Sequence, residues 1–85
     1  MSDDNNDGVV EALAGYAHNA WAGWMAWLFS VSIENDDGTV TIPVELVKRW
    51  KRQIDTPYVD LPKEEKGSDR AEAYKILFIT DRELT

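Results

Sequence analysis

The stretch from Gly8 to Phe29 constrains the fold most, because its spacing predicts a long helix that is non-polar on two sides. Asp7 is suited to cap the N-terminus of this helix, and Glu11 would lie in the first turn, where the helix dipole favours a carboxylate. At about 100° per residue, one broad side collects aliphatic and aromatic residues. These are Val9, Val10, Leu13, Tyr16, Ala17, Ala20, Trp21, Trp24, Trp27 and Leu28. We expect this side to face the core of the domain.

The opposite side of the helix lacks the Lys and Glu residues that are typical of a solvated surface. It carries small, apolar and uncharged polar residues: Gly15, His18, Asn19, Ala22, Met25, Ala26 and Phe29. A helix with two non-polar sides needs two partners. One partner is the rest of the domain, and the other is a second subunit, a ligand, or both.

A short β-hairpin or ordered loop is predicted after this helix. Apolar residues alternate with polar ones on both sides of the stretch 35–38, whose sequence Asn-Asp-Asp-Gly is typical of a turn. The acidic turn does not match a calcium-binding loop, because the pattern would need an acid at position 33, which is Ile33.

Two more helices are predicted in the second half of the chain. The first runs from Pro43 to about Ile54 and ends before Thr56-Pro57, because proline disfavours helical geometry in the residue before it. A short extended link, 58–61, leads to the last helix, from near Pro62 to about Asp81. The residues expected to face inward are Leu46, Val47, Trp50 and Ile54 on the former helix, and Ala71, Tyr74, Leu77 and Phe78 on the latter.

The predicted fold class is therefore mainly α, a compact three-helix domain with a short β-hairpin or loop between the first and second helices. Residues 1–7 are expected to form a disordered acidic tail, residues 8–80 a single domain, and residues 81–85 a C-terminal tail. In 85 residues, only one modest core is expected. The absence of cysteine excludes disulfides, so packing of the nine aromatic residues and self-association are the available stabilisers.

The charge distribution disfavours nucleic acid as a partner. The net charge is −7, whereas phosphate neutralisation needs a surplus of Lys and Arg. Residues 1–47 contain eight acids and no Lys or Arg, and four of the nine basic residues lie together at positions 48–52. That basic stretch is the one place where a small anion would meet concentrated positive charge.

The apolar stretch 12–33 is not expected to span a membrane. His18, Asn19, Ser30 and Ser32 interrupt it, and no Lys or Arg flanks either end. The acidic N-terminus does not resemble a secretion signal. We expect a soluble protein of the bacterial or host-cell cytoplasm that does not contact the membrane.

Catalysis and metal binding are not supported by the residue inventory. The chain has one histidine and no cysteine, and it shows neither a nucleophile triad nor a glycine-rich phosphate loop. A lone His18 does not make a histidine-rich metal site. We therefore expect no enzyme activity, no cofactor and no metal.

Three short motifs resemble a known family. His18 and Trp21 form an HxxW pair, Pro57 to Leu61 reads PYxxL, and the stretch from Glu65 to Ala73 reads EKxxDRxxA. This pattern resembles the RYR (ryanodine-receptor repeat) domain family, in its small stand-alone bacterial or phage type. The segments 38–43 and 49–52 stand where RYR repeats carry a GWxYG segment and an HPxLxPY approach.

The resemblance implies a compact, non-catalytic helical domain with affinity for nucleotide-derived ligands. The ligand-binding residues expected from the motifs and charges are His18, Asn19, Trp21, Arg49, Tyr58, Lys66 and Arg70. Each has a plainer alternative: His18 in a structural hydrogen bond, Trp21 in the core, and Lys66 and Arg70 on a mixed-charge helix surface. The EKxxDR string would either lock its helix to the preceding PYxxL turn or place Arg70 against an anion.

The leading functional hypothesis is a homo-oligomer, a dimer or higher, that binds a small anionic, nucleotide-like ligand. A phage protein of this kind would sequester a host signalling nucleotide. The alternative is a protein-interaction module that docks on a host protein through an acidic, small-residue face, and a third reading is a purely structural oligomer subunit. Convergence of Arg49, Lys66 and Arg70 on one concavity would favour an anion, and scatter would favour a protein partner.

Overall fold

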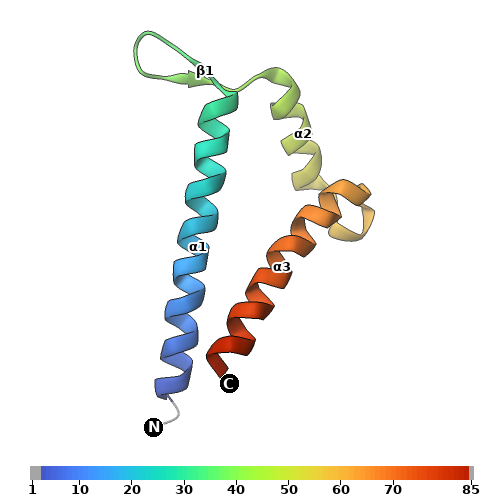
Figure 1. Cartoon of the computed structure of the whole chain (residues 1–85). Coiled ribbons are helices and arrows are strands. Elements are labelled where there is room, and N and C mark those ends of the chain that lie inside the picture. The colour runs from blue at the N-terminus through green and yellow to red at the C-terminus, as the bar shows by residue number, and fades with distance from the viewer. Residues whose placement is uncertain (1–2, 85) are drawn as a thin grey trace.

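A computed structural model describes the chain from residue 3 to residue 84, with side chains from residue 7 onward. The elements follow in the order α1 (Asp3–Val31), β1 (Ile33–Glu34), β2 (Val40–Thr41), α2 (Val44–Asp55), a 3₁₀ turn η1 (Tyr58–Asp60) and α3 (Lys63–Leu84). Three helices with a two-stranded hairpin between the first and the second confirm the predicted fold class (Figure 1).

Both outer helices are longer than predicted. Helix α1 begins at Asp3, so the expected disordered tail, residues 1–7, is helical from that residue onward. Residues 1 and 2 of the expected tail lie outside the described residues. Asp7, expected to cap the helix, therefore lies inside it, where its carboxylate is still near the positive end of the helix dipole. Helix α3 continues to Leu84, beyond the predicted end at Asp81, so the expected C-terminal tail is helical as well, except for its last residue, which is not described.

The hairpin pairs its strands in antiparallel register, with Ile33 opposite Thr41 and Glu34 opposite Val40. Its turn depends on Gly38, whose φ is 89°, a backbone conformation that residues with a Cβ rarely adopt. Asp37 accepts hydrogen bonds from the Thr39 hydroxyl at 2.6 Å and from the Thr39 amide at 3.0 Å. These bonds lower the pKa of Asp37, the hydroxyl bond contributing most.

Proline residues mark the turns between the later helices. Pro43 precedes α2, and its carbonyl accepts the amides of Leu46 and Val47, both at 3.1 Å. The link predicted to be extended contains the η1 turn, in which the Asp60 amide donates to the Pro57 carbonyl at 2.9 Å. Pro57 itself is extended, with φ −59° and ψ 149°, and the turn begins at the residue after it.

The three helices form an open, flat arrangement rather than a closed bundle. In Figure 1, α1 and α3 lie side by side near the two termini and separate toward α2, which bridges their far ends. The radius of gyration is 17.2 Å, whereas a compact chain of this length has about 12 Å. The principal extents are 53 × 35 × 16 Å. No residue of the described part of the chain is buried, so the expected compact core does not form within one chain.

In its first half, helix α3 turns polar residues toward α1. Ser68, Glu72 and Lys75 lie at the gap between the two helices, whereas Tyr74, Leu77 and Phe78, predicted to face inward, are exposed together with Ala71. The spacing did place these four residues on one side of the helix. Spacing does not say toward what that side faces. In the structure, Tyr74 and Phe78 border a hollow of about 390 Å³ that Tyr16 of α1 also lines, whereas Leu77 does not line it. Ile54 of α2, also predicted to face inward, is 80% exposed.

Candidate functional site

Three tryptophans join the C-terminal half of α1 to α2. The ring centroids of Trp24 and Trp50 are 5.5 Å apart, those of Trp27 and Trp50 5.9 Å, and those of Trp24 and Trp27 6.2 Å. These separations are typical of packed aromatic pairs. The cluster therefore holds α2 against α1, while the remaining exposed part of Trp24 faces a cavity between the helices.

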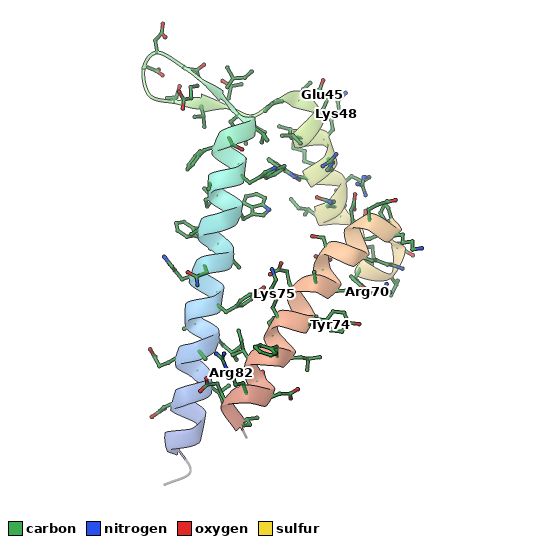
Figure 2. The ribbon with its side chains drawn as sticks, in the orientation of Figure 1. Glu45, Lys48, Arg70, Tyr74, Lys75 and Arg82 are labelled. Carbon is green, nitrogen blue, oxygen red and sulfur yellow. The ribbon has the colours of Figure 1, made fainter. Side chains whose placement is uncertain are left out.

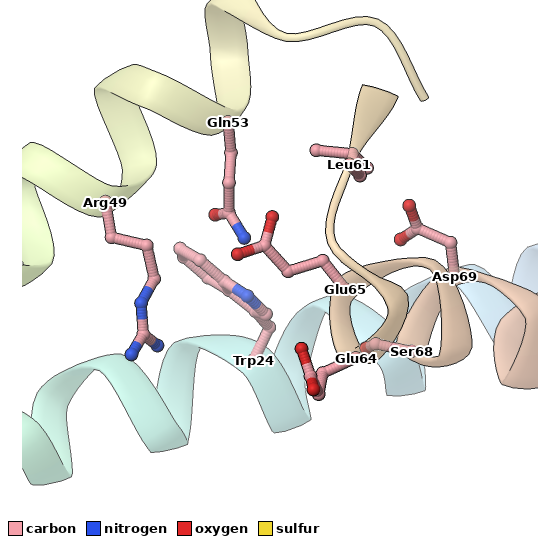
Figure 3. Close-up of a pocket in the computed structure, with 8 residues that line it drawn as sticks. All are labelled: Trp24, Arg49, Gln53, Leu61, Glu64, Glu65, Ser68 and Asp69. Atoms are coloured by element: carbon pink, nitrogen blue, oxygen red, sulfur yellow. The ribbon is translucent and has the colours of Figure 1, made fainter. Parts of the chain in front are cut away.

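This cavity, the α2–α3 cavity, has a volume of about 670 Å³ (Figure 3). Trp24 reaches it from α1, and Arg49 and Gln53 reach it from α2. The remaining lining residues follow η1 or belong to the first two turns of α3: Leu61, Glu64, Glu65, Ser68 and Asp69. One guanidinium and three carboxylates thus share the cavity, so its charge is mainly negative.

An ion pair closes one wall of the α2–α3 cavity. Arg52 donates from Nη2 to Glu65 Oε2 at 2.5 Å and from Nη1 to Glu65 Oε1 at 3.3 Å. The hydrogen bond from Arg52 lowers the pKa of Glu65, with smaller contributions from Gln53 and from the charge of Arg49. Glu65 is therefore occupied by α2, and Arg52 is not directed to a ligand.

A second hollow, the α1–α3 groove, continues from this cavity between the two long helices. It has a volume of about 680 Å³ and shares Trp24, Ser68 and Asp69 with the α2–α3 cavity. Asn19 lines it from α1, and Glu72 and Lys75 line it from α3. Asn19 is thus the one predicted ligand residue that faces this groove.

Two pairs of the predicted residues contact each other. The rings of His18 and Trp21 have centroids 6.0 Å apart, and both side chains are exposed on α1. The Lys66 ammonium lies 5.8 Å from the centroid of the Tyr58 ring, a cation–π contact between η1 and α3. Each pair is a local neighbour contact.

The seven predicted ligand residues do not meet in one pocket of the single chain. Arg49 lines the α2–α3 cavity, Asn19 lines the α1–α3 groove, and Arg70 extends from α3 on the side away from α1 (Figure 2). The reason is geometric. Lys66 and Arg70 are one turn apart on α3, whereas Ser68 and Glu72, which face α1, lie on its other side. The basic groups therefore scatter.

The motif residues explain how α3 is anchored. Glu65 binds Arg52 of α2, and the adjacent Lys66 covers Tyr58 of the PYxxL turn. Of the two roles expected for the EKxxDR string, these contacts support the one in which it locks α3 to the preceding turn.

Several cavity residues were missed by the sequence reasoning. Gln53 lies four residues after Arg49, so their helical spacing could have identified it as a neighbour on the same side of α2. Trp24 was assigned to the core side, and Ser68 carried no signal of its own. Asp69 is part of the EKxxDR string but was not expected at the site, because its location depends on how α3 packs.

The chain matches no protein-family model, no curated protein and no solved structure. The resemblance to the RYR family therefore depends on the three motifs alone and stays a prediction. Within residues 3–84, no helix has the length and apolar character that crossing a membrane requires. Over the same residues, no three His, Cys, Asp or Glu side chains gather as metal ligands would.

Proposed function

We propose that this chain is a non-enzymatic protein-interaction module that docks through the outward side of α1. This side is opposite the residues that line the α1–α3 groove, and at helical spacing it carries Asp7, Glu11, His18, Trp21, Ala22, Met25 and Phe29. The single observation that carries the proposal is the exposure of its aromatic residues. Trp21 is 61% exposed and Phe29 is 53% exposed, on a helix that has no Lys or Arg.

The chemistry of this side specifies the kind of partner. Asp7 and Glu11 provide negative charge near the start of the helix, and Trp21 provides a large aromatic anchor of the type that dominates binding energies at interfaces. Gly15 is exposed beside these residues, and because it has no side chain it allows the backbone of a partner to approach closely. A basic protein surface with an apolar cleft for Trp21 fits these features.

The scatter of the basic residues supports a protein partner over a small anion. Arg49 is the one guanidinium that lines the α2–α3 cavity, which it shares with Glu64, Glu65 and Asp69, and Arg70 does not line it. A phosphate in that cavity would meet more negative than positive charge.

Affinity capture with matched variants tests the proposal. A lysate of the cell in which the protein occurs is passed over immobilised wild type, Trp21→Ala and Ile54→Ala, the last being an exposed apolar residue outside the proposed surface. A partner that binds wild type and Ile54→Ala, and is lost with Trp21→Ala, is then purified. We expect its Kd to rise at least tenfold with Trp21→Ala and to weaken with salt. Equal capture by all three proteins would rule out this surface.

Binding of a nucleotide-like anion is the second candidate, because Trp24, Arg49 and Gln53 converge on one cavity. Its volume falls within the range of small-molecule sites, about 300–1,000 Å³. An aromatic ring, a guanidinium and an amide are the groups that stack a base, pair with phosphate and hydrogen-bond a base edge. The RYR resemblance favours the same ligand class, and sequestration of a signalling nucleotide would be the resulting function.

A thermal-shift screen with cyclic and ADP-ribose-type nucleotides tests this second candidate. A genuine ligand should raise the Tm of wild type and of Lys51→Ala, whose side chain is exposed on α2 outside the cavity, but not of Arg49→Ala. If no nucleotide raises the Tm of wild type, this candidate is abandoned.

A further inference from the structure

The apolar stripe of α3 is the largest feature that neither proposed function uses. Tyr74 is 69% exposed, Leu77 56%, Phe78 64% and Leu84 60%. In Figure 2, Lys75 extends from α3 toward α1, whereas Tyr74 and Arg70 extend away from it. Tyr74 and Phe78 also border a hollow that Tyr16 of α1 lines. Each residue of the stripe is nevertheless more than half exposed, so most of its hydrophobic contribution is unused within one chain.

The exposed area is large enough for stable interfaces. The accessible surface is 6856 Å², whereas a compact protein of 9.7 kDa exposes about 5,100 Å². The excess is roughly 1,700 Å², and a standard interface removes about 800 Å² from each partner. The surplus, which includes the walls of the α2–α3 cavity and the α1–α3 groove, is therefore larger than the area that one interface removes.

The stripe is complementary to itself when two copies run antiparallel. Arg70, Tyr74, Leu77 and Asp81 follow one another at intervals of four, three and four residues, which is the spacing of a helix–helix seam. A two-fold axis between positions 75 and 76 places Tyr74 opposite the partner's Leu77 and Arg70 opposite the partner's Asp81.

The next layer of the seam matches as well. The same axis places Gly67 opposite the partner's Leu84, so the residue without a side chain meets a bulky one. Among residues 7–84, neither Arg70 nor Asp81 has an ion pair within the chain. Each is thus available to the other subunit.

We infer that two copies of this chain pair through α3 in an antiparallel, two-fold arrangement held by the apolar stripe and by two Arg70–Asp81 ion pairs. The occupant is a second copy rather than a foreign protein, because the charge that complements Arg70 lies at the symmetric position of the same helix. The pairing uses α3, whereas the proposed docking surface lies on α1. The test of the pairing is therefore independent of the tests of both proposed functions.

Charge reversal tests the pairing directly. Wild type is expected at twice the chain mass by native mass spectrometry and light scattering at about 10 µM. Arg70→Asp alone opposes two pairs of carboxylates and Asp81→Arg alone opposes two pairs of guanidiniums, so each should raise the dimer Kd at least tenfold. The Arg70→Asp/Asp81→Arg double variant should dimerise like wild type.

Mixing the two single variants gives a second, sharper outcome. One chain then carries aspartate at both positions and the other carries arginine at both, so a heterodimer with two complementary pairs should form. A heterodimer would also show that the single variants fail to dimerise because of charge repulsion, since two misfolded chains would not pair on mixing. A monomeric wild type, or charge variants whose dimerisation is unchanged or not restored by the double variant and by mixing, would overturn the inference.

Disulfide trapping provides a readout that is independent of charge. The natural chain has no cysteine, so Tyr74→Cys/Leu77→Cys should form a covalent dimer on mild oxidation, and Ser68→Cys/Glu72→Cys, on the side that faces α1, should not. Equal trapping at both positions would contradict the antiparallel seam.

Discussion

Arg52 and Glu65 form a bidentate ion pair that joins the last turn of α2 to the first turn of α3. The side chain of Glu65 is 20% exposed and that of Arg52 is 46% exposed. Because α2 and α3 diverge from a short 3₁₀ turn, this pair helps to set the angle between them. That angle in turn shapes the α2–α3 cavity.

Acidification should weaken this connection. The pKa of Glu65 lies below its ordinary value of 4.5, so the stabilisation is present above about pH 4.5 and is lost as the pH falls through the lowered pKa. We expect the Tm of wild type to exceed that of Glu65→Gln by a small amount at pH 7. The difference should disappear at the acidic end of a Tm series from pH 7 to 2.5, and a difference that persisted there would show that the charge of Glu65 is not its cause.

Trp50→Ala should be the most destabilising single substitution in the tryptophan cluster. Trp50 contacts both Trp24 and Trp27 but is half-buried, so we expect a loss of about 2–3 kcal/mol, less than the ~3–5 kcal/mol for a fully buried tryptophan. Urea unfolding followed by circular dichroism measures it. Trp21→Ala is the control, since this residue is 61% exposed and lies outside the cluster beside His18, so the change should alter stability by less than about 1 kcal/mol. Equal losses would mean that the cluster does not join α2 to α1.

Gly38→Ala should destabilise the hairpin even though nothing lies within 4 Å of the added Cβ. The cost, about 1 kcal/mol, comes from the φ of 89°. Gly23→Ala is the matched control. It also meets no atom within 4 Å but lies inside α1, so it should stabilise the protein by about 0.5–1 kcal/mol. If both variants changed the free energy of unfolding in the same direction, the backbone argument would fail.

Replacement of Tyr58 separates its ring from its hydroxyl. Tyr58→Phe keeps a ring under the Lys66 ammonium and should leave the free energy of unfolding unchanged, whereas Tyr58→Leu should lower it by about 0.5–1 kcal/mol. Chemical denaturation of both variants measures the difference. Should Tyr58→Phe cost as much as Tyr58→Leu, the hydroxyl rather than the cation–π contact would be the important group.

The local patterns predicted most of the secondary structure. The turn residues 35–38, Pro43 and Thr56-Pro57 each marked the end or start of an element, because glycine and proline restrict the backbone wherever they occur. The ends of α1 and α3 were missed because the sequence shows no residue that clearly stops either helix there, and helix boundaries are weak signals without one. The candidate site was predicted less well, since Arg49 was identified but Trp24 and Gln53 were not assigned to its cavity.

The sequence alone determined that the chain has three helices, that α1 is non-polar on two sides, and that Tyr74, Leu77 and Phe78 share one side of α3. Only the tertiary structure decided that these three residues stay more than half exposed and that Arg49 and Arg70 lie apart. The physical reason is that periodicity defines a helix side relative to its own axis. What each side faces depends on the whole set of packing partners, and for α3 the described chain does not supply the partner that its apolar stripe requires.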